Sequence, residues 1–337
     1  MTEGPGAGSA ACLLDLLAGR CRAQAVSTAA ALGLADRLAA GPRTAEDLAR
    51  EIEAQAPTLA RLLDFLVGLG LCTRTPDGAY ALTANGAALR SDALGPFAAF
   101  LGGPEFWDPW SRLRDVLREG GPGAYERAHG ATLYADLAAR PAAAQAYDAA
   151  IDAFTRTQAE ALCGAVDLSA VRTLADIGGG RGTALVCVLA RWPHLRGILF
   201  DLPHVVADAQ PRLDAACPGR VEVRAGDFTE RVPQGADAYL LKGILHNWDD
   251  AGAATLLRRC AEALPPGGRL LAIEPILAPD ERMDAARMLD LEMLVLTGGR
   301  QRRKPELRRL FHGAGLTLDR VQPLVAGSWV LEASARG

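Results

Sequence analysis

Two different periods of apolar and polar positions run along this chain of 337 residues, and they predict two kinds of structure. In the second half, short apolar runs predict strands at Thr173–Ile177, Gly197–Asp201, Val221–Ala225, Ala238–Lys242 and Arg269–Glu274. Helical patterns separate these runs, and the alternation predicts an α/β fold with a doubly wound parallel sheet. Two last strands, Leu316–Pro323 and Ser328–Ala335, are joined only by a tight turn around Gly327, so we expect an antiparallel hairpin there.

The first part of the chain has helical periodicity instead. From about Ala23 to Arg90 the pattern predicts three helices and then a short hairpin, which is the order of a winged helix. Such a domain can bind DNA through its third helix. Here that helix is rich in leucine, Arg61 is its only cation, and Asp64 would repel phosphate. We therefore expect this helix to contact protein and not DNA.

Composition narrows the range of partners. The formal net charge of −4 and the aromatic content of 5% provide neither a basic face nor a stacking surface for nucleic acid. The seven cysteines form no CxxC pair, and the histidines have no ligand spacing, so we expect reduced thiols and no metal site. No secretory signal or membrane span is apparent. We expect a soluble cytoplasmic protein without a membrane partner.

The sequence LADIGGGRG, residues 174–182, carries the clearest chemical signal. Glycines that follow an apolar strand let the backbone approach a bound nucleotide. A dinucleotide fingerprint would need a further glycine where Thr183 stands, so a pyrophosphate cradle is not indicated. Asp201 ends the next strand about 20 residues on, at the spacing that grips ribose hydroxyls. The alternative is a plain strand-to-helix turn with Asp201 as a helix cap. Together the two signals favour a nucleoside ligand.

Several motifs in fixed order resemble those of a known family. They are DIGGGRG, FDLPHV, AGDF, LLKGILHNWDD and LPPGGRLLAIEPIL. The chain resembles the class I S-adenosylmethionine-dependent methyltransferases, and within them the small-molecule O-methyltransferases that include plant caffeate-type and bacterial antibiotic-tailoring enzymes. The resemblance implies a Rossmann-like catalytic domain at residues 166–337, a helical connector to the substrate pocket at 96–165, and a winged-helix-like homodimerisation domain at 1–95.

The resemblance also implies a set of residues that bind the cofactor S-adenosylmethionine. The set is Gly178, Gly180, Gly182, Asp201, Leu202, Asp227, Phe228 and Lys242. By resemblance, Asp201 holds the ribose and Asp227 and Phe228 face the adenine. Lys242 would lie near the methionine end, although a solvated lysine at a strand end is an equal alternative.

His246 stands where the family keeps its general base. A phenol with a pKa of about 10 is protonated at neutral pH, and a positioned imidazole that removes the proton contributes about a hundred- to ten-thousandfold. Glu274 is the carboxylate expected to hold the ring. Asn247 replaces the usual aspartate of HDW, and Gln301 stands where many relatives have a glutamate. An amide can orient imidazolium but cannot stabilise it as strongly.

The acceptor is expected to be a flat aromatic small molecule, of the polyketide-like kind. Trp107, Trp110 and Met293 are the candidate substrate contacts. The helical pattern at Met283–Leu296 otherwise predicts core, and Arg300–Lys304 predicts a solvated basic patch. Two alternatives stay open. The same scaffold and cofactor can serve hydroxylation, decarboxylation or cyclisation, or the chain can be a winged-helix regulator that senses a nucleoside.

Overall fold

The computed structural model describes residues 10–280, 283–325 and 327–336. The chain divides into two compact units, each described here by itself. The first unit comprises the chain up to Trp107 together with Gln145–Ala153, and the second comprises Asp108–Ala144 and the chain from Phe154 onward. No helix in the described ranges is long and apolar enough to cross a membrane.

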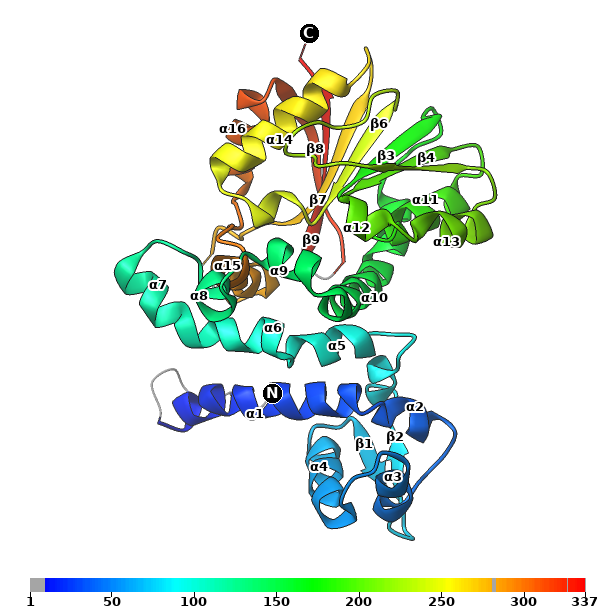
Figure 1. Cartoon of the computed structure of the whole chain (residues 1–337), viewed down its shortest axis with the longest axis vertical. Helices are drawn as coiled ribbons and strands as arrows, with labels where there is room; N and C mark the ends of the chain where they lie inside the picture. Colours follow the sequence, from blue (N-terminus) through cyan, green and yellow to red (C-terminus); the bar gives the residue numbers. More distant parts are fainter. Residues whose placement is uncertain (1–9, 281–282, 326, 337) are drawn as a thin grey trace. The chain divides into compact units, whose positions relative to one another are not determined.

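The first unit is mainly helical, and a two-stranded antiparallel hairpin follows the first four helices that the structure describes (Figure 1). Its elements are α1 (Ala10–Ala31), α2 (Leu34–Ala39), α3 (Ala45–Glu51), α4 (Ala56–Gly68), β1 (Cys72–Arg74), β2 (Tyr80–Leu82), η1 (Gly86–Leu89), α5 (Gly95–Leu101) and α6 (Pro104–Trp107). Thr44 caps α3 by accepting from the Asp47 amide at 3.1 Å. Leu48, Leu63 and Tyr80 are fully buried between the helices and the hairpin. The predicted hairpin is present, but four helices precede it among the described residues where three were expected, because Gly33, at a φ of 61°, separates α1 from α2. The first helix also begins well before Ala23.

The second unit is built on a seven-stranded sheet in the order β5-β4-β3-β6-β7-β9-β8. Its strands are β3 (Thr173–Ile177), β4 (Arg196–Asp201), β5 (Val221–Ala225), β6 (Ala238–Lys242), β7 (Arg269–Pro275), β8 (Leu316–Pro323) and β9 (Ser328–Ala335). The first five pair in parallel, whereas β9 runs antiparallel to β7 and to β8. The predicted parallel sheet and its antiparallel terminal hairpin are therefore confirmed.

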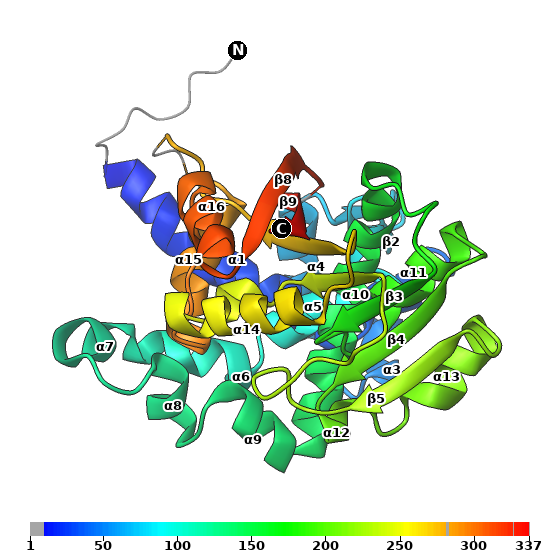
Figure 2. The ribbon, with the colours of Figure 1, turned by 90° about the horizontal axis from the view of Figure 1, so that it is seen from above.

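Helices cover both faces of this sheet (Figures 1 and 2). The helical elements of the second unit are η2 (Asp108–Arg112), α7 (Leu113–Glu119), α8 (Ala124–His129), α9 (Leu133–Ala139), α10 (Pro141–Ala165), α11 (Thr183–Arg191), α12 (Pro203–Val206), α13 (Ala209–Ala216), η3 (Leu245–Asn247), α14 (Asp250–Ala263), α15 (Ala285–Leu296) and α16 (Lys304–Gly313), of which α10 also crosses into the first unit. Ala175 packs with α14 and α16, and its neighbour Leu174 packs with α11 and α13. Because successive strand residues point to opposite faces and both faces are covered, the inner residues of β3 are apolar except for Asp176.

Candidate active site

The glycine turn after β3 has a backbone that other residues would strain. Gly178, Gly180 and Gly182 have φ values of 67°, 58° and 80°, a region that glycine enters at no steric cost. A Cβ on Gly178 would lie 2.6 Å from Cδ1 of Ile244 and 3.3 Å from Cε1 of Phe228. A Cβ on Gly180 would meet nothing within 4 Å. The turn is therefore packed on one side and bare on the other.

Asp201 fastens this turn to the end of the neighbouring strand. Its two carboxylate oxygens accept from the amides of Gly180 at 2.8 Å and Leu202 at 2.7 Å. Burial raises the pKa of Asp201, and these two backbone donors act in the opposite direction. A carboxylate has about four acceptor positions, so each oxygen can accept a further bond. A bare glycine backbone beside a buried acceptor fits the ribose of a nucleoside.

The third parallel strand end places Asp227 and Phe228 at the same edge. Asp227 accepts from the Thr229 amide at 2.7 Å and so shapes the turn after β5. The ring of Phe228 approaches Gly178 and meets Trp248 edge-on, with ring centroids 6.1 Å apart. An aromatic face beside the glycine turn is suited to an adenine ring. The expected cofactor residues from β3, β4 and β5 therefore come together.

Asp176 is a buried acid beneath the turn that the sequence analysis did not single out. It is 1% exposed, and its Oδ2 has no partner among the described residues. Burial raises its pKa to about 7, and the positive charge of Lys242 partly offsets this. A Cβ on Gly179 would lie 2.6 Å from this carboxylate. Lys242 is thus close to a buried acid. In the sequence, Asp176 could have been noticed only as an acid inside an otherwise apolar strand.

His246 and Glu274 form the best-defined polar contact of the site. Nδ1 of His246 lies 2.6 Å from Oε2 of Glu274. The other oxygen, Oε1, accepts from the amides of Ile244 at 3.0 Å and Leu245 at 2.7 Å. An ionised carboxylate only accepts, so Nδ1 carries the ring proton, and Nε2 of the neutral ring is the basic nitrogen. Glu274 is 2% exposed, which keeps water from competing for these bonds.

The two residues that replace carboxylates in this region have different surroundings. Nδ2 of Asn247 donates to the Gly243 carbonyl at 3.0 Å, so this side chain closes the turn that carries the histidine. Gln301 is 1% exposed, and its Nε2 has no partner within the described part of the chain. Its backbone amide donates to Asp290 at 2.7 Å. In the part of the chain that the structure describes, neither side-chain amide has a hydrogen bond to the His246 ring.

The loop after α15 holds the backbone of this turn. The Arg300 amide donates to the His246 carbonyl at 2.9 Å. Arg302 is 3% exposed and donates to Asp250 at 2.8 Å and to the carbonyls of Leu245 and Trp248. The prediction of a solvated basic patch at Arg300–Lys304 is therefore wrong for Arg302, because its guanidinium satisfies carbonyls at the end of the turn.

Helix α15 brings a second acid near the histidine, and the sequence analysis missed it. Glu292 is partly buried. Burial raises its pKa to about 7, and the nearby His246 charge acts against that rise. The candidate substrate residues are spread more widely. Met293 is buried in α15, Trp110 is 39% exposed in η2, and Trp107 is 37% exposed in α6 of the first unit.

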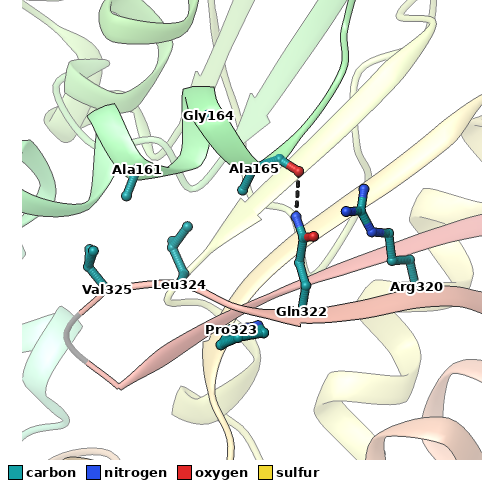
Figure 3. A pocket seen from close by; sticks show the side chains of 8 residues that line it. All are labelled: Ala161, Gly164, Ala165, Arg320, Gln322, Pro323, Leu324 and Val325. Carbon is teal, nitrogen blue, oxygen red and sulfur yellow. Dashed lines mark hydrogen bonds between the residues drawn. The ribbon is translucent and has the colours of Figure 1, made fainter.

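A separate surface hollow lies between the last turns of α10 and strand β8 (Figure 3). Its wall includes Gln322, whose side-chain amide donates to the Ala165 carbonyl. None of the candidate cofactor, catalytic or substrate residues lines this hollow, so it is not part of the candidate active site.

Known proteins similar to this chain include O-methyltransferases, and the similarity extends over nearly its whole length. An O-methyltransferase domain model matches residues 110–317, and an O-methyltransferase dimerisation domain model matches residues 14–92. The phenazine O-methyltransferase PhzM of Lysobacter antibioticus is 37% identical, over 99% of this chain and 99% of its own. The aclacinomycin 10-hydroxylase RdmB of Streptomyces purpurascens is 36% identical, over 87% of this chain and 81% of its own.

A solved structure extends the comparison to bound ligands. It is an O-methyltransferase, NcsB1, from neocarzinostatin biosynthesis in complex with S-adenosylmethionine and 2-hydroxy-5-methyl naphthoic acid. It has a TM-score of 0.77 and 34% identity to this chain, and the match covers 93% of this chain and 96% of that one.

Proposed function

Because this chain belongs to the family of S-adenosylmethionine-dependent O-methyltransferases with an N-terminal dimerisation domain, we propose that it methylates a phenolic hydroxyl of a flat aromatic secondary metabolite, with His246 as general base. The observation that carries the proposal is the 2.6 Å contact between His246 and the buried Glu274. The aromatic acceptors of relatives, a phenazine and a naphthoic acid, support this class of substrate.

The chain's own groups do the work of holding and moving a proton. When bound, S-adenosylmethionine supplies a methyl group activated by its sulfonium. Glu274 holds the ring through Nδ1, and Nε2 takes the proton of the acceptor hydroxyl as its oxygen becomes the nucleophile. The negative charge of Glu274 then stabilises the imidazolium. Asn247 acts by closing the turn that sets the position of the ring.

The cofactor site follows from the three strand ends and their turns. We assign the ribose hydroxyls to Asp201 and the adenine to Asp227 and Phe228. Gly178, Gly180 and Gly182 supply the bare backbone beside them, and Leu202 presents its amide to Asp201. Lys242, whose charge acts on the buried Asp176, is assigned to the methionine end.

The dimerisation domain supports a homodimer as the working form. Helix α1 carries an exposed run of large apolar residues, with exposed fractions between 58% and 71% at Leu13, Leu14, Leu16 and Leu17. A groove between α1 and α4 is lined by Leu62 and Phe65, and Phe65 is 42% exposed. An apolar patch of this kind is suited to burial against a second copy.

Mass spectrometry of polycyclic phenols incubated with methyl-labelled S-adenosylmethionine tests the proposal. We expect labelled methyl in the product, and a loss of at least about a hundredfold in kcat for His246→Asn. The matched control is His312→Asn, since His312 is exposed. Labelled product formed at the wild-type rate by His246→Asn would refute the role of His246.

A second function has one observation in its favour, because a relative of 36% identity is a hydroxylase. The two amides, Asn247 and Gln301, also give the site less negative charge near His246 than carboxylates would. The same measurement separates the two functions. A product that gains oxygen, or rearranges at constant mass, in place of gaining the labelled methyl would favour the second.

A further inference from the structure

Glu292 is an acid on an apolar face of helix α15. Its neighbours one turn away on the helix are all apolar: Met288, Leu289, Val295 and Leu296. Val295 and Leu296 are buried, whereas Met288 is 59% exposed, so Glu292 lies where this side of the helix passes from solvent into the protein interior. Placing a carboxylate here costs desolvation free energy unless a donor compensates it. The helical pattern alone therefore gives no packing reason for an acid at this position.

No donor among the described residues compensates this carboxylate. Within residues 10–280, 283–325 and 327–336, Glu292 has neither a hydrogen bond nor an ion pair at contact distance. Burial raises the pKa of Glu292, and the positive charge of His246 acts against this rise. Two other acids beside the histidine turn have partners: Glu274 accepts three bonds, and Asp290 accepts one from the Gln301 amide. Of these three acids, only Glu292 has its acceptor positions open, and its helix packs against η3, which carries His246.

Helix α15 connects the histidine turn to the other elements around the candidate acceptor site. It packs against η3, which carries His246, and against η2, which carries Trp110. It also packs against α8, beside which it lies in Figure 1. Nδ1 of His246 is occupied by Glu274 on the sheet side. The atom of His246 left to meet an acceptor is Nε2, and Glu292 comes from a different element than Glu274. A molecule held at Nε2 is therefore a candidate donor to Glu292.

We propose that Glu292 selects the acceptor by accepting a hydrogen bond from a hydroxyl or amino group on the ring carbon next to the reacting hydroxyl. This inference rests on the function proposed above, because it takes Nε2 of His246 as the atom that faces the reacting hydroxyl. Adjacent ring substituents lie side by side, so one can meet His246 while the other meets Glu292. An acceptor with a methoxy group at that carbon leaves the carboxylate unpaired, and a carboxylate there is repelled.

The test uses naphthols that differ only at the carbon next to the hydroxyl. The probes are β-naphthol and its derivatives with an adjacent hydroxyl, amino or methoxy group. Calorimetry measures their dissociation constants with the full-length protein saturated with S-adenosylhomocysteine, and kcat/KM is measured with labelled S-adenosylmethionine in parallel. We expect the wild type to prefer the adjacent hydroxyl or amine over the methoxy compound by at least about tenfold, the range for hydrogen bonds to charged groups. Comparing the hydroxyl probe with the amino probe shows which of the two donors Glu292 prefers.

Three variants complete the design. Glu292→Leu, which suits an apolar helix face, should reduce the preference to within about twofold, and the isosteric Glu292→Gln should give an intermediate value. The control Glu262→Leu makes the same change on the exposed side of α14 and should keep the wild-type preference. An equal preference in wild type and Glu292→Leu, or equal weakening for all four probes, would overturn the inference. If the enzyme methylates the probes but does not prefer an adjacent donor, the role of Glu292 fails and the proposed function stands. If it prefers an adjacent donor but methylation does not depend on His246, the proposed function fails.

Discussion

The contact between Glu274 and His246 predicts a severe defect for Glu274→Gln, although the two side chains have nearly the same shape. Three N–H groups point at the two oxygens of Glu274: the amides of Ile244 at 3.0 Å and Leu245 at 2.7 Å, and Nδ1 of His246 at 2.6 Å. A glutamine has one carbonyl oxygen and one NH2 group. If the oxygen keeps the two backbone donors, the NH2 group faces Nδ1.

Nδ1 can then only accept, and the ring proton moves to Nε2. A histidine protonated at Nε2 cannot take the proton of an acceptor hydroxyl, so the variant loses its base and the counter-charge of imidazolium together. General-base catalysis contributes about a hundred- to ten-thousandfold. We expect kcat to fall by at least about a hundredfold, which is about 2.7 kcal/mol at 1.36 kcal/mol for each factor of ten. KM should change little, because Glu274 is buried beneath the ring.

Steady-state methyl transfer between pH 7 and pH 10 measures this effect. The defect should narrow toward pH 10, because a phenol with a pKa of about 10 then ionises without a base. Glu262→Gln, at an exposed position of α14, is the matched control. A Glu274→Gln enzyme with wild-type kcat at pH 7, or with a defect that does not depend on pH, would refute the reasoning.

Three further predictions follow from the same structure. Gly178→Ala places a Cβ 2.6 Å from Ile244 at a φ of 67°, so calorimetry should show at least about a tenfold loss of affinity for S-adenosylmethionine. The control Gly235→Ala, also at positive φ but with open space around it, should leave that affinity unchanged. Burial raises the pKa of Asp176 from 3.8 to about 7, so the protonated side chain favours the folded state at low pH and this contribution is lost as the pH rises through 7. Without cofactor, Asp176→Asn should therefore raise the melting temperature at pH 8 by at least about 3 °C, and the gain should vanish near pH 4. Leu16→Glu with Leu17→Glu, two leucines of α1 that are 71% and 60% exposed, should yield a folded monomer in sedimentation, and an unchanged dimer would place the interface elsewhere.

Local patterns in the sequence accounted for most of the fold. The seven strands of the large sheet lie within one residue of the expected bounds, because an apolar run and the turn that ends it are fixed by neighbouring residues. The glycine turn and Asp201 were also readable, since parallel strands bring their carboxyl ends to one edge. His246 and Glu274 were named only through the resemblance to a family. No periodicity links two residues that are 28 positions apart.

Only the tertiary structure decided which polar groups meet. Pairing of β6 with β7 carries Glu274 beneath the turn of His246. The same packing buries Arg302 against carbonyls, although its sequence neighbourhood predicted a solvated patch. It also packs α15, which carries Glu292, against η3, which carries His246. Met288 of the same helix is 59% exposed, although the helical pattern predicted core. The sequence determined the elements because apolar periodicity and turns depend on neighbouring residues. The charges around His246 depend on long-range packing that brings distant segments into one low-dielectric site.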